Sequence, residues 1–190
     1  MAESINPTPP GPDWQALLQL AVAQAGLFTT AQAAEVGFSP ELLIHHVKRG
    51  RLARSRRGIY RVKHLPPQGD EQLVELWLWS RREGVLSHRT ALALFDLSDV
   101  LPAEVEMTVP TAWNGRRLRV PEPLRLHHAD LEPEERQWVG HVPVTTPHRT
   151  LHDCIVTLVE RDLVHQAIDQ ALAQGRLLDQ EAHALREAAS

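Results

Sequence analysis

The sequence predicts an α+β protein whose chain divides into two units of opposite charge. Short helical and strand-like segments fill residues 13–63, whereas residues 71–190 combine longer amphipathic segments with alternating apolar stretches. Residues 1–63 hold eight basic and four acidic side chains, a net charge of +4, and the remainder holds 12 and 20, a net charge of −8. Opposite signs indicate that one unit binds a polyanion and the other binds something else or nothing.

The chain begins with a segment that is poor in apolar residues. Residues 1–12 contain four prolines and a glycine, which predicts a flexible tail. Asp13 is then placed to cap a helix, because apolar residues recur with helical spacing from Trp14 to Val22. We expect the apolar stripe of this helix to pack on the elements that follow.

Two short helices about a glycine turn come next. Thr29 or Thr30 can cap a helix over residues 31–35, and Gly37 supplies the left-handed turn that ends it. Ser39 and the proline after it open the second helix as N-cap and first-turn residue. The pattern predicts a helix-turn-helix.

A predicted β-hairpin follows the second helix. Gly50 ends the helix, and residues 52–54 and 59–62 read as two short strands joined at a Ser-Arg-Arg-Gly turn. A helix-turn-helix followed by such a hairpin is a winged helix-turn-helix. Residues 13–63 are therefore predicted to form a DNA-binding domain of this kind.

The charge of this region supports the prediction. Eight of the chain's 20 lysines and arginines lie in residues 48–63, and no acidic residue occurs between Glu41 and Asp70. Such a block is the electrostatic footprint of phosphate contact; the alternative is a basic surface without a ligand. The residues expected to contact DNA are Ser39, Glu41, His45, Lys48, Arg49, Arg51, Arg54, Arg56, Arg57 and Arg61.

The second helix would read bases in the major groove. Glu41 can accept a hydrogen bond from a cytosine amine, and His45 can donate or accept one. Sequence specificity is expected to be modest, because the other outward residues near them are apolar. The residues expected to face outward are Glu41, Leu42, Ile44, His45, Lys48 and Arg49, and those expected to face inward are Phe38, Leu43 and Val47.

Residues 64–70 contain two prolines and a glycine and are predicted to be a hinge. Residues 71–190 are predicted to form a mixed helical domain with a small antiparallel sheet. The expected strands are residues 104–109, 124–127 and 142–145. The expected helices begin at Asp70, at His88 after an N-cap at Ser87, and at Pro147 after a cap at Thr146, and two more cover residues 162–174 and 179–188.

Residues for enzyme chemistry are not found in a usable pattern, so no catalytic residue, metal ligand or cofactor is predicted. His148 and His152 have the spacing of a zinc-binding pair, but no third ligand is indicated. The single cysteine, Cys154, is expected to be a buried, inert thiol. With no membrane span and no signal peptide evident, the expected location is the cytoplasm.

The sequence also resembles a known family. The runs GLFTTAQA and KRGRLARSRRGIYRV resemble the N-terminal winged-helix domain of AbiEi-type antitoxins of type IV toxin–antitoxin (abortive infection) systems. The runs VLSHRTALALFDL, EVEMTVP, LRLHHADL and VPVTTPHRTLHDC follow in the order found in that family's C-terminal domain.

The resemblance implies a transcriptional repressor that autoregulates its operon by binding inverted repeats in operator DNA and that counters a nucleotidyltransferase toxin. It leaves open whether the toxin is contacted directly and whether the repressor self-associates on DNA. Two other interpretations stay open: a DNA-targeted accessory of a nuclease or other enzyme, and a module that binds only proteins. The basic block in residues 48–63 argues against the last.

Overall fold

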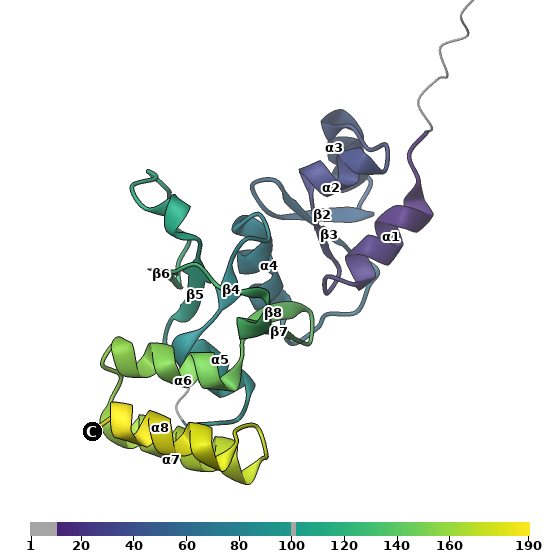
Figure 1. Ribbon diagram of the computed structural model, residues 1–190. Helices are drawn as coiled ribbons and strands as arrows, with labels where there is room; N and C mark the ends of the chain where they lie inside the picture. Colours follow the sequence, from purple (N-terminus) through teal and green to yellow (C-terminus); the bar gives the residue numbers. More distant parts are fainter. Residues whose placement is uncertain (1–10, 100–101) are drawn as a thin grey trace, which may run out of the picture. The chain divides into compact units, whose positions relative to one another are not determined.

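The computed structural model describes residues 11–99 and 102–190, which form two compact α+β units (Figure 1). The first unit runs to Trp79 and the second begins at Ser80. The fold class is therefore the one predicted. Most of the predicted tail, residues 1–10, lies outside the described residues.

The first unit has the element order of a winged helix-turn-helix followed by one more helix. Its three strands form an antiparallel sheet in the order β1-β3-β2. The elements are α1 (Trp14–Val22), β1 (Leu27–Thr29), α2 (Thr30–Glu35), α3 (Pro40–Lys48), β2 (Leu52–Arg56), β3 (Ile59–Val62) and α4 (Glu71–Trp79).

The predicted caps set the starts of the first three helices. The Ala16 amide donates to Asp13 Oδ1 at 3.0 Å, and the Leu42 amide donates to Ser39 Oγ at 3.2 Å. Thr29, rather than Thr30, caps α2 and forms a capping box with Gln32. Each side chain thus accepts from a backbone amide that the helix leaves without an internal partner.

Apolar side chains from α1, the helix-turn-helix and the hairpin meet in one core. Trp14 lies edge-on to Phe38, with 4.9 Å between ring centroids, as expected if α1 packs on the helix-turn-helix. The buried members of this core are Leu17, Ala21, Phe28, Ala33, Phe38, Leu43, Leu52, Tyr60 and Val62.

Helix α4 falls in the first unit, although the sequence suggested that the second unit begins at residue 71. It contacts β1 and β3, and its carboxylates Glu71 and Glu75 form ion pairs with Arg61 and Arg56. The compact units accordingly separate after Trp79, not in residues 64–70.

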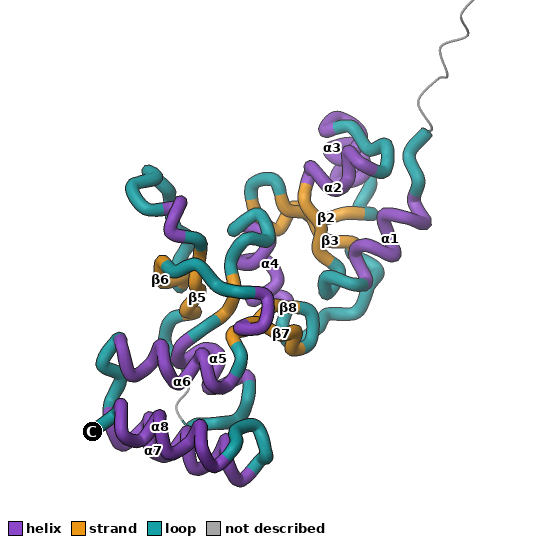
Figure 2. Tube along the Cα trace, viewed as in Figure 1, coloured by secondary structure: helices purple, strands orange, loops and turns teal. Residues whose placement is uncertain are grey.

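The second unit contains a five-stranded sheet in the order β6-β5-β4-β8-β7 (Figure 2). Helix α5 contacts both β5 and α6, and α6 also contacts α7 and α8. The elements are β4 (Val85–Leu86), α5 (His88–Leu94), β5 (Val105–Val109), β6 (Leu124–His128), β7 (Arg136–Val139), β8 (Val142–Thr145), α6 (Pro147–Val156), α7 (Arg161–Ala173) and α8 (Asp179–Ala188).

The prediction of an antiparallel sheet is wrong for this unit, because the sheet is mixed. Strand β4 pairs with β8 in parallel, and β5 pairs with β6 in parallel, while the β4–β5 and β7–β8 pairs are antiparallel. A parallel pair requires a long connection, and residues 110–123 supply one between β5 and β6. The sequence reading also missed β4 and β7, which are short.

Candidate nucleic-acid interface

The end of α3 and the β2–β3 hairpin carry six exposed cationic side chains, which we call the basic surface. Gly50, at a φ of 75°, ends the helix and leads directly into β2. None of the six forms an ion pair with another described residue. They are Lys48, Arg49, Arg51, Arg54, Arg57 and Lys63.

Two of the arginines predicted to contact DNA have carboxylate partners instead. Arg61 donates from Nε and Nη2 to Glu71 Oε1 at 3.0 and 2.9 Å, and its guanidinium also donates to the carbonyls of Val62 and Leu65. Arg56 Nε donates to Glu75 Oε1 at 2.7 Å. These side chains connect the wing to α4, so they are less available to phosphates than the basic surface is.

This pairing predicts that Arg61 acts on stability more than on DNA affinity. We expect Arg61→Ala to lower the free energy of unfolding by about 1–3 kcal/mol, because the half-buried Glu71 carboxylate loses its cationic partner and the Leu65 carbonyl loses its guanidinium donor. Chemical denaturation measures this change. An unaltered denaturation curve together with a large loss of DNA affinity would show that Arg61 faces the DNA.

The wing hairpin has a tight tip. Arg57 and Gly58 form its two-residue turn, with Gly58 at a φ of 78° that favours glycine. The register shifts between Arg54 and Arg56, which makes Ser55 a bulge, and the Ser55 hydroxyl donates to Glu75. The bulge and this bond hold one side of the wing toward α4, and Arg54 and Arg57 remain exposed.

The exposed face of α3 includes Glu41, Ile44 and His45, as expected. Leu42 does not face outward as predicted, because it packs against the core of the first unit. Ser39, predicted to contact DNA, is exposed, and its hydroxyl already accepts the Leu42 amide as a helix cap.

Glu41 is the acidic residue on this face. A bond to its own backbone amide and one from Ser39 lower the pKa of its carboxyl, so it is charged at neutral pH. A carboxylate repels phosphates but accepts from a cytosine amine, which is consistent with a base contact and not with a backbone contact.

His46 was not singled out by the sequence reading, and the structure buries it. Its ring lies edge-on to Trp14 at 4.7 Å between centroids, and burial, followed by the charges of His45 and Arg51, lowers its pKa. It belongs to the core and places the neighbouring His45 on the exposed face. The sequence did not predict that His46 is buried, because two adjacent histidines do not show which of the two rings faces inward.

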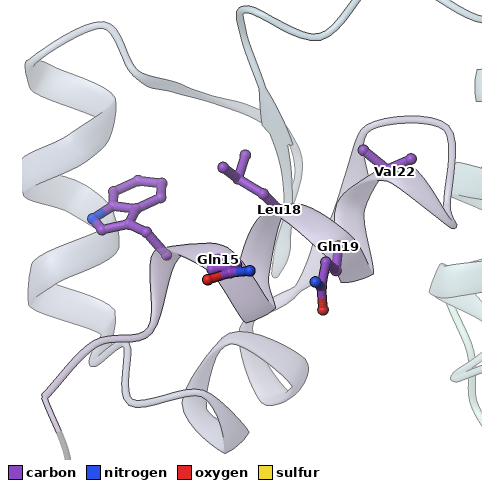
Figure 3. Close-up of a pocket in the computed structure, with 5 residues that line it drawn as sticks. Gln15, Leu18, Gln19 and Val22 are labelled. Carbon is purple, nitrogen blue, oxygen red and sulfur yellow. The ribbon is translucent and has the colours of Figure 1, made fainter.

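A shallow hollow of about 580 Å³ lies along α1 (Figure 3). Its lining is Trp14, Gln15, Leu18, Gln19 and Val22. These side chains carry no charge, so the hollow does not have the chemistry of a phosphate site.

The histidine-rich motifs of the second unit form a buried polar cluster. The His88 and His127 rings stack at 3.6 Å between centroids, and His127 Nε2 lies 3.3 Å from Glu106 Oε1. Ser87 is the N-cap residue of α5, as predicted, but its side chain forms no cap hydrogen bond; its hydroxyl accepts from Thr108 and bonds with His88 Nδ1. These contacts join α5 to β5 and β6.

The other predicted contacts of the second unit have structural roles as well. Arg149 Nε donates to Asp153 Oδ1 at 2.8 Å, the pair expected from their spacing, and Arg149 also pairs with Glu135 at 2.7 Å. Cys154 is buried, and burial raises the pKa of its thiol to about 12. Within residues 11–99 and 102–190 no three His, Cys, Asp or Glu side chains are grouped as metal ligands would be.

Comparison with known proteins confirms the resemblance for the first unit. Residues 15–63 match the family described as transcriptional regulator, AbiEi antitoxin. The winged helix-turn-helix of the first unit is therefore similar to part of an antitoxin-type transcriptional regulator. No curated protein sequence matches the chain.

A solved structure resembles the whole chain in fold. It is the crystal structure of the RV2827C protein from Mycobacterium tuberculosis. The match covers 96% of this chain and 81% of that protein's chain, with a TM-score of 0.56 and 16% sequence identity. At this identity the likeness concerns the fold alone. Among the described helices, none is long and apolar enough to cross a membrane.

Proposed function

We propose that this protein is a transcriptional repressor that binds duplex DNA through the basic surface and acts as the antitoxin of a type IV toxin–antitoxin pair. The observation that carries the proposal is the set of six exposed cations, without ion-pair partners among the described residues, at the end of α3 and on the wing of a winged helix-turn-helix. The family match over residues 15–63 supports both the regulator and the antitoxin role.

The division of contacts follows from the exposed chemistry. Arg54 and Arg57 at the wing would meet phosphates or the minor groove, where guanidinium groups bind without reading much sequence. Glu41 and His45 would face base edges in the major groove. Ile44, whose side chain is 51% exposed, would contact a thymine methyl group.

The finer parts of the proposal concern the operon. The repressor would bind inverted repeats in its own promoter and counter a nucleotidyltransferase toxin encoded beside it. Two copies on an inverted repeat would place two basic surfaces on one duplex. The test is the neighbouring reading frame: one that encodes a nucleotidyltransferase would support this part, and its absence from the locus would argue against it.

The proposal predicts a steep salt dependence of DNA binding. If all six cations of the basic surface engage phosphates, the logarithm of the binding constant should fall with the logarithm of the salt concentration with a slope of about −5. A fluorescence-anisotropy titration of the full chain on its own upstream DNA, at four or five salt concentrations, measures the slope. Binding with a slope near zero would refute the assignment.

His45 provides a test of base reading. We expect His45→Ala to reduce the preference for the upstream DNA over a scrambled duplex by roughly 1–3 kcal/mol, and to change the salt slope little. Competition titrations with the two duplexes measure it. A uniform loss of affinity for both would mean that His45 contacts the backbone instead.

A further inference from the structure

A second group of arginines lies on the connection between β5 and β6, far along the chain from the wing. Arg116, Arg117 and Arg119 occur within residues 107–121, which contain no acidic side chain. The unit around them is acidic, with 12 basic and 17 acidic residues between 80 and 190. Three of these 12 cations lie on one loop, residues 114–120, whose residues are all exposed and which we call the arginine loop.

The base of the arginine loop is held in place. The Trp113 ring is buried, and its Nε1 donates to Glu83 Oε2 at 2.9 Å. Thr111 donates from its amide and its hydroxyl to the Asp130 carboxylate at 3.0 and 2.6 Å. The Arg116 guanidinium lies over the Trp113 ring, 5.0 Å from its centroid. These contacts fix the position of the residues from which the arginine loop extends.

The tip of the arginine loop offers unused donors. Figure 2 shows the connection between β5 and β6 projecting beyond the ends of both strands. Arg117 and Arg119 are exposed, and neither forms an ion pair or hydrogen bond with another described residue. Leu118 between them is 40% exposed. Two free guanidinium groups beside a glycine turn repeat the chemistry of the wing, where Arg54 and Arg57 stand near Gly58.

We propose that the arginine loop is a second phosphate-binding site, through which the second unit contacts duplex DNA in addition to the contact made by the first unit. Guanidinium groups present a planar fork that matches phosphate oxygens. An exposed leucine next to them suits the minor groove, where apolar side chains insert beside arginines. Outside the loop the unit holds nine basic and 17 acidic residues, so its net charge there repels a polyanion and favours contact at the loop.

This proposal rests on the proposed function only in that both contacts would be to one DNA molecule. Two contacts joined by one chain strengthen each other through effective concentration, so the second raises affinity only on DNA long enough for both. The length of the duplex therefore separates the two sites experimentally.

The test compares full-length variants on two duplexes of unrelated sequence, one of about 16 base pairs, roughly one and a half turns, and one of about 40. The loop variant is Arg117→Gln with Arg119→Gln. The matched control is Arg81→Gln with Arg82→Gln, which removes the same charge from exposed positions of the same unit. The wing variant is Arg54→Gln with Arg57→Gln. Thermal unfolding of each variant checks that the fold is retained.

We expect the loop variant to lose about tenfold in affinity for the long duplex near 0.1 M salt, with a slope less steep by about 2, and to match the wild type on the short one. The control should match the wild type on both. Equal binding of loop variant and wild type to the long duplex would overturn the second site and leave the proposed function intact.

Two further outcomes are decisive. If the wing variant binds like the wild type while the loop variant does not, the arginine loop stands and the proposed role of the first unit fails. Binding of the same variants to vesicles that contain phosphatidylserine is also measured, because an anionic membrane presents similar phosphates. Binding to vesicles that is lost in the loop variant, without any change on DNA, would assign the loop to a lipid surface and overturn the proposal.

Discussion

A protein with Arg54 and Arg57 replaced by glutamine is expected to lose repression of its own promoter and to keep its fold. Both side chains are exposed and lack partners among the described residues, so their removal should change stability by less than about 0.5 kcal/mol. Loss of two phosphate contacts should reduce operator affinity by about tenfold or more near 0.1 M salt. A promoter–reporter fusion and an anisotropy titration measure the two effects.

The same variant separates repression from antitoxicity. Expressed from an independent promoter, it should still rescue growth in the presence of the cognate toxin, because rescue does not require the operator. The Arg81→Gln, Arg82→Gln protein serves as the control of equal charge and should both repress and rescue. Failure of a folded wing variant to rescue would mean that the basic surface itself opposes the toxin, for example by binding RNA.

We replace Arg54 and Arg57, and not Arg56, because of long-range contacts that the sequence does not show. All eight cations between residues 48 and 63 looked equivalent, because nothing acidic lies among them. In the fold, Glu71 and Glu75 on α4 come from beyond the glycine- and proline-rich segment and reach Arg61 and Arg56. The local density of charge therefore predicted where the basic residues lie. Ion pairs with α4 then determine which of these residues are free to contact phosphates.

Local signals predicted the helices and the hairpin of the first unit well, but not the short strand β1. Caps at Asp13, Thr29 and Ser39 and the turn at Gly37 depend on the chemistry of residues close in sequence, and the helices begin where these indicate. The orientation of Leu42 was harder to predict, because helical spacing does not determine whether a residue at the border of the apolar face points inward or outward.

The second unit was less predictable, because its sheet depends on pairing between distant segments. Strand β4 contains two residues, Val85 and Leu86, and has no periodicity to recognise. Its parallel partner β8 lies far along the chain, with Leu86 opposite Val144. The arginine loop was also not predicted, because three arginines in an acidic half change a charge total little, and their common exposure appears only in the fold.

Buried histidine predicts an acid-sensitive second unit. The His88 ring is 3% exposed, and burial, reinforced by the neighbouring His127 and opposed by Asp153 and Glu106, lowers its pKa from 6.5 to about 4. The unfolded chain therefore takes up a proton on this ring at a higher pH than the folded chain does. Stability from this group is fully present above about pH 6.5 and is lost as the pH falls toward 4, by about 3 kcal/mol in all.

Glu106 adds to the loss at the lower end of this range. Burial favours a raised pKa, but hydrogen bonds with His127 and the Arg89 amide outweigh it, so the pKa of Glu106 is lowered from 4.5. Its contribution is present above 4.5 and disappears as the pH falls below that value. The decline between pH 6.5 and 4.5 is thus due to histidine: chiefly to His88, and also to His46 of the first unit, whose pKa burial lowers as well.

We therefore expect His88→Asn to flatten the pH dependence of unfolding between pH 6.5 and 4.5. Asparagine removes the titrating ring and tolerates the left-handed backbone of this position, where φ is 53°. The control is His148→Asn, an exposed histidine on α6, which should retain the decline of the wild type. Urea denaturation of the full chain at half-unit steps of pH gives the free energies. An equal decline in the His88→Asn protein and in the control would show that His88 is not the group whose protonation destabilises the fold.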